Sequence, residues 1–297
     1  MTTDTKTTDI KTMDKKVKKD KVKFIWTPKK AATAFSAYMI GLFFIYPYIN
    51  MLLTSLKPNE ELYAFPMKRL PQSWQFDNYL EVWSVAPIGN FLRASVIVSI
   101  CATLLVLIVS VPAAYYVARN RFRGRSAFLL LVLATQMFSP TALIIGIFRE
   151  VKFFGLLDTW AALIIVNAGF NLAFAVWLLS GFFASVPVEI EEAAMVDGCT
   201  RFASLRRVVL PVTLPGLVTA VIFTFVSTWN EFTVALTVIS SPTRQPISTG
   251  ITTFIGQYDV AWEYLFTTTA IAIIPVVILF ISIEKYLVGG LTAGSVK

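Results

Sequence analysis

Residues 192–211 read EAAMVDGCTRFASLRRVVLP, a polar segment that lies between two long apolar runs. The preceding residues 187–192 (PVEIEE) place a proline and carboxylates in an opening turn, and both favour the start of a helix. Gly198 allows the positive φ that ends a helix and turns the chain. The pattern predicts a short helix, a glycine turn and a second, basic helix over 201–209 at a membrane surface, with Pro211 opening the next apolar run.

The composition is that of an integral membrane protein. Hydrophobic residues make up 56% of the 297 residues and charged residues 15%, whereas soluble domains carry roughly a quarter charged residues. Six runs contain no Asp, Glu, Lys or Arg, and each is long enough to cross about 30 Å of hydrocarbon as a helix. We therefore expect an all-α membrane protein with six transmembrane helices. The runs are residues 31–56, 94–118, 126–148, 159–188, 208–230 and 264–283.

Lysine and arginine are distributed unequally between the two sides of these runs. Ten lysines lie in residues 1–30, which we expect to be a disordered tail, and four arginines lie in 119–125. The excess of positive charge marks the cytoplasmic side and places both termini there. The net charge of +8 is then explained by topology and by contact with anionic membrane lipids, and it is no argument for nucleic acid. On the outer side, the prolines and aromatic residues of 57–91 predict a folded cap.

Several chemistries have no residues to support them. The chain contains no histidine and two cysteines, so zinc sites and histidine-based catalysis are not expected. Cys101 lies inside an apolar run and Cys199 in the predicted cytoplasmic loop, and no disulfide is expected. No phosphate-binding loop of the P-loop type is present. We therefore predict no catalytic residue, no metal site and no cofactor in this chain.

A few polar residues lie at the ends of the runs or inside them. Glu231 is the one ionisable residue that we assign to an apolar span, with Ser227 on the same helical face and Asn230 beside it. Asn167 and Asn171 lie one helical turn apart in the fourth run. A buried charge is costly, so Glu231 is expected to face a polar cavity or a partner. These residues predict either a polar translocation path or helix–helix hydrogen bonds.

The joint pattern of Glu192-Ala193-Ala194, Gly198 and Leu210-Pro211 resembles the EAA signature of permease subunits of binding-protein-dependent ABC importers. Three further stretches resemble the carbohydrate branch, the maltose-type second permease. The resemblance extends from about residue 31 to the end, and more particularly it is to the permease of an alginate-oligosaccharide importer. The three stretches are SLKPNEELYAFPMKRLPQSWQFDNYLEVW (55–83), TWNEFTVAL (228–236) and GLTAGSVK (290–297).

This resemblance implies an ABC importer type I permease fold and a division of the chain. Residues 1–30 are the tail, 31–288 the transmembrane domain with a coupling loop at 187–211, and 289–297 a cytoplasmic C-terminal tail. The resemblance also implies two contacts with an ATPase subunit. The expected coupling residues are Glu191, Glu192, Ala193, Ala194, Asp197, Gly198 and Arg201, and the expected tail contacts are Gly290, Leu291, Thr292, Ala293 and Gly294.

The resemblance further implies an assembly in the inner membrane of a bacterium. The chain is expected to pair with a second permease as a heterodimer and with a homodimeric ATPase that binds ATP and magnesium. A periplasmic or extracellular solute-binding protein would deliver a carbohydrate, expected to be an oligosaccharide of the alginate or maltodextrin class. The alternatives are a secondary transporter or channel that works without ATP, for which several intramembrane charges are expected, and a membrane scaffold or sensor.

Overall fold

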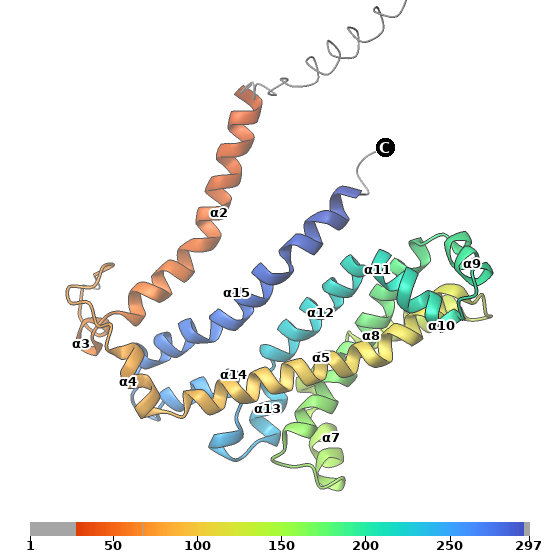
Figure 1. The fold of residues 1–297 in the computed structure, drawn as a ribbon. Helices are drawn as coiled ribbons and strands as arrows, with labels where there is room; N and C mark the ends of the chain where they lie inside the picture. The colour runs from red at the N-terminus through yellow and green to blue at the C-terminus, as the bar shows by residue number, and fades with distance from the viewer. Residues whose placement is uncertain (1–27, 67, 294–297) are drawn as a thin grey trace, which may run out of the picture. The chain divides into compact units, whose positions relative to one another are not determined.

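A computed structural model describes residues 28–66 and 68–293 of the chain (Figure 1). Most of the lysine-rich tail, residues 1–27, therefore lies outside the described residues. Contacts divide the chain into two compact units, Met1–Asn50 and Met51–Lys297. The described part of the first unit belongs to a single helix, and the functional residues of the coupling loop all lie in the second unit.

The described residues are almost entirely helical, as predicted. One isolated antiparallel bridge joins Ile255 and Val260. The helices are α2 (Pro28–Ser55), α3 (Asn59–Leu62), α4 (Asn78–Val85), α5 (Ile88–Arg119), α6 (Arg125–Thr135), α7 (Pro140–Phe153), α8 (Trp160–Ser185), α9 (Val188–Val196), α10 (Arg201–Ser204), η1 (Leu205–Val209), α11 (Leu210–Val212), α12 (Leu214–Trp229), α13 (Thr233–Val238), η2 (Pro242–Arg244), α14 (Ile247–Gly250), η3 (Ile251–Phe254) and α15 (Trp262–Ala293).

Four described helices are long and apolar enough to cross a membrane: Ala31–Ser55 of α2, all of α5, all of α8 and Trp262–Glu284 of α15. Two further runs are bent pairs of helices, which bring the number to six if each pair is one span. The all-helical membrane fold predicted from the apolar runs is confirmed. The third and the fifth run, however, are not continuous helices.

The third run, 126–148, is broken near its middle. Helix α6 ends at Thr135, α7 begins at Pro140, and their axes differ by 90°. Ser139 accepts a hydrogen bond on its hydroxyl from the Thr141 N–H at 3.3 Å, which is a helix N-cap. Because proline lacks an N–H and suits the first helical position, this Ser-Pro pair starts a new helix where hydropathy alone suggested a continuous one.

The fifth run is broken at Thr213, where the chain bends by 80° between residues 201–212 and α12. Pro211 was expected to open the membrane helix, but it lies in α11 before the bend. Pro215 instead occupies the first turn of α12, where its fixed φ is compatible with a helix start. The second helix predicted for this segment therefore continues past its expected end at Val209, as far as Val212.

Helices α5, α8 and α12 form the centre of the second unit, and Figure 1 shows them side by side. Near the coupling loop they enclose a cluster that includes Ala114, Phe183 and Val209, all fully buried. The packing between α8 and α12 is close: a Cβ on Gly216 would overlap the ring of Phe182. Small residues permit such approaches between membrane helices. This rigid centre supports the coupling loop at one end of α5.

The predicted outer cap is folded. Lys57 is buried and donates from Nζ to the Lys68 carbonyl at 2.6 Å, while the buried Asn78 amide donates to the Ser55 carbonyl at 3.0 Å. The Tyr79 hydroxyl lies 2.8 Å from the Ser55 hydroxyl. These bonds satisfy polar groups that would be costly to bury alone, and they join the segment after α2 to α4.

Asp158 ties the turn before α8 to the loop after α13. Its Oδ1 accepts from the N–H groups of Ser240 at 3.1 Å and Ser241 at 2.9 Å, and its Oδ2 accepts from the Ser241 hydroxyl at 2.5 Å. Arg244 Nη1 lies 3.1 Å from Oδ2 and 2.5 Å from the Asp158 carbonyl. The hydrogen bond from the Ser241 hydroxyl is the main cause that lowers the pKa of Asp158 below its ordinary value.

This environment predicts an acid-sensitive link. A carboxyl group with a pKa lowered by folding stabilises the native state at pH values above its unfolded pKa of about 3.9. That stabilisation is lost as the pH falls through the folded pKa. We expect Asp158→Asn to lower the thermal unfolding midpoint at pH 7, and the difference from the wild-type chain to shrink steadily below about pH 4. A difference that does not change with pH would contradict the assignment.

Candidate functional site

The coupling loop has the helix–turn–helix form that the sequence predicts. Gly198 follows α9 with φ +87°. Its N–H donates to the Met195 carbonyl at 3.1 Å, and the Cys199 N–H donates to the Ala194 carbonyl at 3.0 Å. These two bonds form a Schellman motif, the helix ending that requires a left-handed residue. No atom would lie within 4 Å of a Cβ at Gly198, so the backbone conformation alone requires glycine here.

The second helix of the loop begins with a cap. The Thr200 hydroxyl accepts from the Ala203 N–H at 3.2 Å. The helical chain then passes through five residues of π-helix, Leu205–Val209, before it reaches Val212. Leu205 and Val209 are buried against the bundle, whereas Arg206 and Arg207 are exposed. The predicted amphipathic character of this helix is confirmed.

Glu191 anchors the loop to the end of α5. Its side chain is 5% exposed and forms an ion pair with Arg119. Arg119 donates from Nε to Oε1 at 2.5 Å, and the Tyr115 hydroxyl donates to Oε2 at 2.7 Å. Arg119 also donates from Nη1 to the Val186 carbonyl at 3.1 Å. Among the expected coupling residues, Glu191 is therefore an internal anchor rather than part of an exposed contact surface.

The other expected coupling residues lie mainly on the outside of the loop. Glu192, Ala193, Asp197, Gly198 and Arg201 are exposed, and Ala194 is half-buried. Two large apolar residues join them at this surface: Val196 is 87% exposed and Phe202 is 74% exposed. An apolar surface of this kind within a polar loop is typical of a protein contact site.

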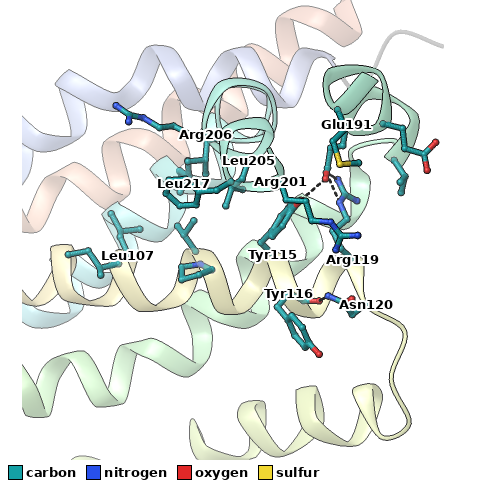
Figure 2. A pocket seen from close by; sticks show the side chains of 18 residues that line it. Leu107, Tyr115, Tyr116, Arg119, Asn120, Glu191, Arg201, Leu205, Arg206 and Leu217 are labelled. Atoms are coloured by element: carbon teal, nitrogen blue, oxygen red, sulfur yellow. Dashed lines mark hydrogen bonds and ion pairs between the residues drawn. The ribbon is translucent and has the colours of Figure 1, made fainter. Parts of the chain in front are cut away.

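A groove of about 1100 Å³ lies between α5 and the helices of the coupling loop (Figure 2). One wall is a face of α5, and the opposite wall is formed by α9 to α12. Tyr115, Arg119 and Glu191 meet inside it through the bonds described above. The lining residues are Leu107, Ile108, Val111, Pro112, Tyr115, Tyr116, Arg119, Asn120, Val188, Glu191, Glu192, Met195, Arg201, Phe202, Leu205, Arg206, Leu210 and Leu217.

The sequence suggested that Glu231 lies inside a membrane helix. In the structure it lies between two helices, α12 and α13. Helix α12 ends at Trp229, and the Glu231 carboxylate accepts from the N–H groups of Val234 at 2.7 Å and Ala235 at 3.0 Å. These are free N–H groups in the first turn of α13, which favour a negative charge. The Ser248 hydroxyl donates to the Glu231 carbonyl at 2.7 Å. Glu231 thus stabilises the break between α12 and α13.

The other residues expected on the path divide by burial. Ser227 and Asn230 are exposed near the end of α12. Asn167 and Asn171 are each 4% exposed. Their amides donate to the carbonyls of Leu163 and Asn167, both at 2.9 Å, so these bonds return to α8 itself. These amide nitrogens therefore do not form the helix–helix hydrogen bonds that were one of the two expectations from the sequence.

The expected C-terminal contact residues lie partly beyond the described chain. The backbone of Gly290, Leu291, Thr292 and Ala293 is helical and completes α15. Helix α15 thus continues across residue 289, where the tail was expected to begin. Gly294 and the residues after it lie outside the described residues.

Sequence reasoning missed the partners of Glu191 and the exposed apolar pair. Tyr115 and Arg119 lie about 70 residues before the loop, and only their location at the end of an apolar run indicated a place near the membrane surface. Val196 and Phe202 are apolar residues in a polar segment, which was the available signal. Among the described residues, no group of three or more His, Cys, Asp or Glu side chains is placed to hold a metal ion.

Comparisons with known proteins agree with this geometry. The family model described as "Binding-protein-dependent transport system inner membrane component" matches residues 108–292. The chain is 36% identical to the sulfoquinovosyl glycerol transport system permease protein SmoH of Agrobacterium fabrum, over 85% of this chain and 89% of that protein. It is 28% identical to the trehalose/maltose transport system permease protein MalG of Thermococcus litoralis, over 91% and 97%.

The fold is similar to that of a solved permease. A crystal structure of a bacterial ABC transporter involved in the import of the acidic polysaccharide alginate matches with a TM-score of 0.74. The match covers 88% of this chain and 99% of that chain at 22% sequence identity. At this identity the likeness concerns the fold.

The role of the Arg119–Glu191 pair as an anchor can be tested by measuring the stability of the full chain. Removing one partner of a buried ion pair leaves the other charge unpaired and costs about 3–5 kcal/mol. We expect Arg119→Met to lower the stability of the full chain in detergent micelles by about 3 kcal/mol in thermal unfolding. The double change Arg119→Met with Glu191→Leu should recover most of this loss. Arg121→Met, at an exposed arginine two residues later, is the matched control, and an equal loss there would contradict the anchor.

Proposed function

Because this chain belongs to the family of inner membrane components of binding-protein-dependent transport systems, we propose that it forms one half of the translocation path of an ATP-driven oligosaccharide importer. It is a carbohydrate-type permease subunit, a multi-pass inner membrane protein without catalytic activity of its own. The other half of the path is a second permease. A homodimeric ATPase binds ATP and magnesium, and an external solute-binding protein delivers the sugar.

The observation that supports this proposal is an exposed coupling loop that is fixed to the end of α5. Glu192, Ala193 and Asp197 lie on the outside of the coupling loop, while the buried Glu191 holds it to α5. An ATPase subunit that contacts the exposed residues can therefore move α5 with the loop. The apolar side chains of Val196 and Phe202 extend this contact surface, and the C-terminal residues Gly290 to Gly294 are a second proposed contact with the ATPase. Both termini are cytoplasmic in this arrangement.

The mechanism is a shift between two conformations. ATP-driven closure of the ATPase pair moves the two coupling loops, and the bundle alternates between inward-open and outward-open states. A ligand shifts such an equilibrium only by its different affinity for the two states. No covalent chemistry within this chain is required.

Ser227, Asn230 and Glu231 are the residues proposed for the path or its gate. Ser227 and Asn230 are exposed, and Glu231 sets the direction of the chain between α12 and α13. Asn167 and Asn171 are buried in the described conformation, so they reach a sugar only if α8 moves relative to its neighbours.

The substrate class is a carbohydrate, and an oligosaccharide fits the relatives named for diacetylchitobiose and for trehalose or maltose. The relatives with named substrates include transport proteins for sulfoquinovosyl glycerol, diacetylchitobiose and trehalose or maltose. The alginate class is supported by a likeness of fold alone. A panel of alginate, maltodextrin and chitin oligosaccharides, each supplied with the binding protein, would identify the sugar through stimulation of ATP hydrolysis by the purified complex.

Reconstituted vesicles separate this function from its alternatives. With the second permease, the ATPase and the binding protein, we expect sugar uptake that depends on ATP. Uptake driven by an ion gradient without ATP indicates a secondary transporter or channel instead. Absence of uptake from a correctly assembled complex indicates a scaffold or sensor.

The glycine turn of the coupling loop provides a direct test. A side chain at a left-handed position costs roughly 1–2 kcal/mol, and a branched Cβ costs more. Because the turn sets the angle between α9 and α10, we expect Gly198→Val to lower ATP-coupled uptake at least about tenfold while the protein remains in the membrane. Gly124, with φ +91° in the other cytoplasmic turn, offers the matched change Gly124→Val. Equal effects of the two changes would show general backbone damage.

A second test concerns Glu231. Loss of its carboxylate leaves two N–H groups at the start of α13 without their acceptor, a change worth about 1 kcal/mol. We expect Glu231→Ala to reduce uptake while the amount of purified complex stays within about twofold, and Glu231→Gln, which retains an acceptor, to have a smaller effect. Loss of the complex itself would favour a packing role.

A further inference from the structure

The groove between α5 and the coupling loop has an apolar floor that is open to the surroundings. Leu107, Ile108 and Val111 line it from α5, and Leu217 lines it from α12. Ile108 is 70% exposed. An exposed apolar surface on a membrane helix is stable when hydrocarbon covers it. The floor therefore suits an acyl chain.

The groove becomes polar along its length. From Leu107 to Asn120 the helix rises about 20 Å, and over that distance its lining changes from aliphatic residues to Tyr115, Tyr116 and Arg119. Arg119 is the last residue of α5, which is one of the candidate spans. The groove thus connects hydrocarbon depth with the membrane surface that the proposed topology places in the cytoplasm.

The charges around the groove leave an excess of positive charge. Arg119 and Glu191 neutralise each other. Arg201 and Arg206 line the opposite wall, both are exposed, and neither has a hydrogen bond or ion pair with another described side chain. Glu192 is the remaining carboxylate of the lining. Apart from the Arg119–Glu191 pair, the groove lining therefore contains two guanidinium groups and one carboxylate.

From this combination we propose that the groove binds an anionic phospholipid of the inner leaflet. The phosphate contacts Arg201 at the polar end of the groove, and one acyl chain lies along Ile108 and Val111 of α5. Arg206, which points toward the other end of the groove (Figure 2), adds positive charge to the same wall. Basic pockets between transmembrane helices on the cytoplasmic side are known to take anionic headgroups. The charge complementarity favours this lipid over a zwitterionic one, and the apolar floor favours a lipid over a free anion.

The site links lipid composition to the coupling loop. Arg201 and Arg206 belong to the two-helix segment that follows Gly198, so a bound headgroup fixes that segment at the membrane surface. This part of the inference rests on the proposed function, since it assigns the loop to the cytoplasmic side. Lipid binding itself is measured without sugar or ATP, and its failure is therefore distinguishable from a failure of transport.

Adjacent arginines give a matched pair of variants. Arg206 lines the groove, whereas Arg207 is equally charged and exposed but does not. The full chain, purified in detergent and freed of lipid, is titrated with phosphatidylglycerol or phosphatidylcholine, and bound lipid is counted by native mass spectrometry. We expect phosphatidylglycerol to bind more tightly. Arg201→Gln should weaken it about fivefold, Arg206→Gln should weaken it less, and Arg207→Gln should leave it unchanged.

A variant of the apolar floor separates a lipid from a free anion. Ile108→Trp fills the floor without changing charge, and it should weaken phosphatidylglycerol while retention of inorganic phosphate stays the same. Equal binding of the two lipids, or equal effects of the changes at Arg206 and Arg207, would overturn the proposal. Loss of bound phosphatidylglycerol when the chain is assembled with the second permease and the ATPase would also overturn it, because a protein surface would then cover the groove.

Discussion

The buried ion pair between Glu191 and Arg119 is the interaction on which the functional part of the molecule depends. A carboxylate that is 5% exposed is tolerated only if a charged partner and further hydrogen bonds compensate for its lost hydration. Arg119 and the Tyr115 hydroxyl supply them. The coupling loop is consequently fixed to the end of a membrane helix, and a force applied to its exposed residues reaches α5 directly.

The bends in two of the apolar runs have a related consequence. Where α12 turns away from the preceding helix by 80°, residues 201–212 form a separate segment, with Leu205 and Val209 packed inward and the arginines outward. The same segment supplies one wall of the groove along α5. A single break at Thr213 therefore separates from α12 both the segment that we propose as an ATPase contact and the arginines that line the groove.

Much of this arrangement follows from local chemistry. Runs without charge indicate helices because lipid offers no partners for backbone groups, and Gly198 indicates a left-handed turn because other residues adopt it at a cost. The sequence did not indicate the breaks near Ser139 and Thr213, since hydropathy averages over a proline without reporting a change of direction. Glu231 was misplaced for a different reason: the apolar residues on both sides of it do not show that one helix ends at Trp229 and another begins at Thr233.

The amino-acid sequence by itself determined that the chain is a helical membrane protein, which side of it is basic, and where a helix–turn–helix leaves the bilayer. These properties depend on composition and on residues close together in the chain. Only the tertiary structure decided that Glu191 is an anchor, that Asn167 and Asn171 bond to their own helix, and that two arginines lie across a groove from α5. Such properties depend on which distant surfaces meet. Contacts between segments some 70 residues apart produce no pattern of apolar and polar residues in either segment from which they could be predicted.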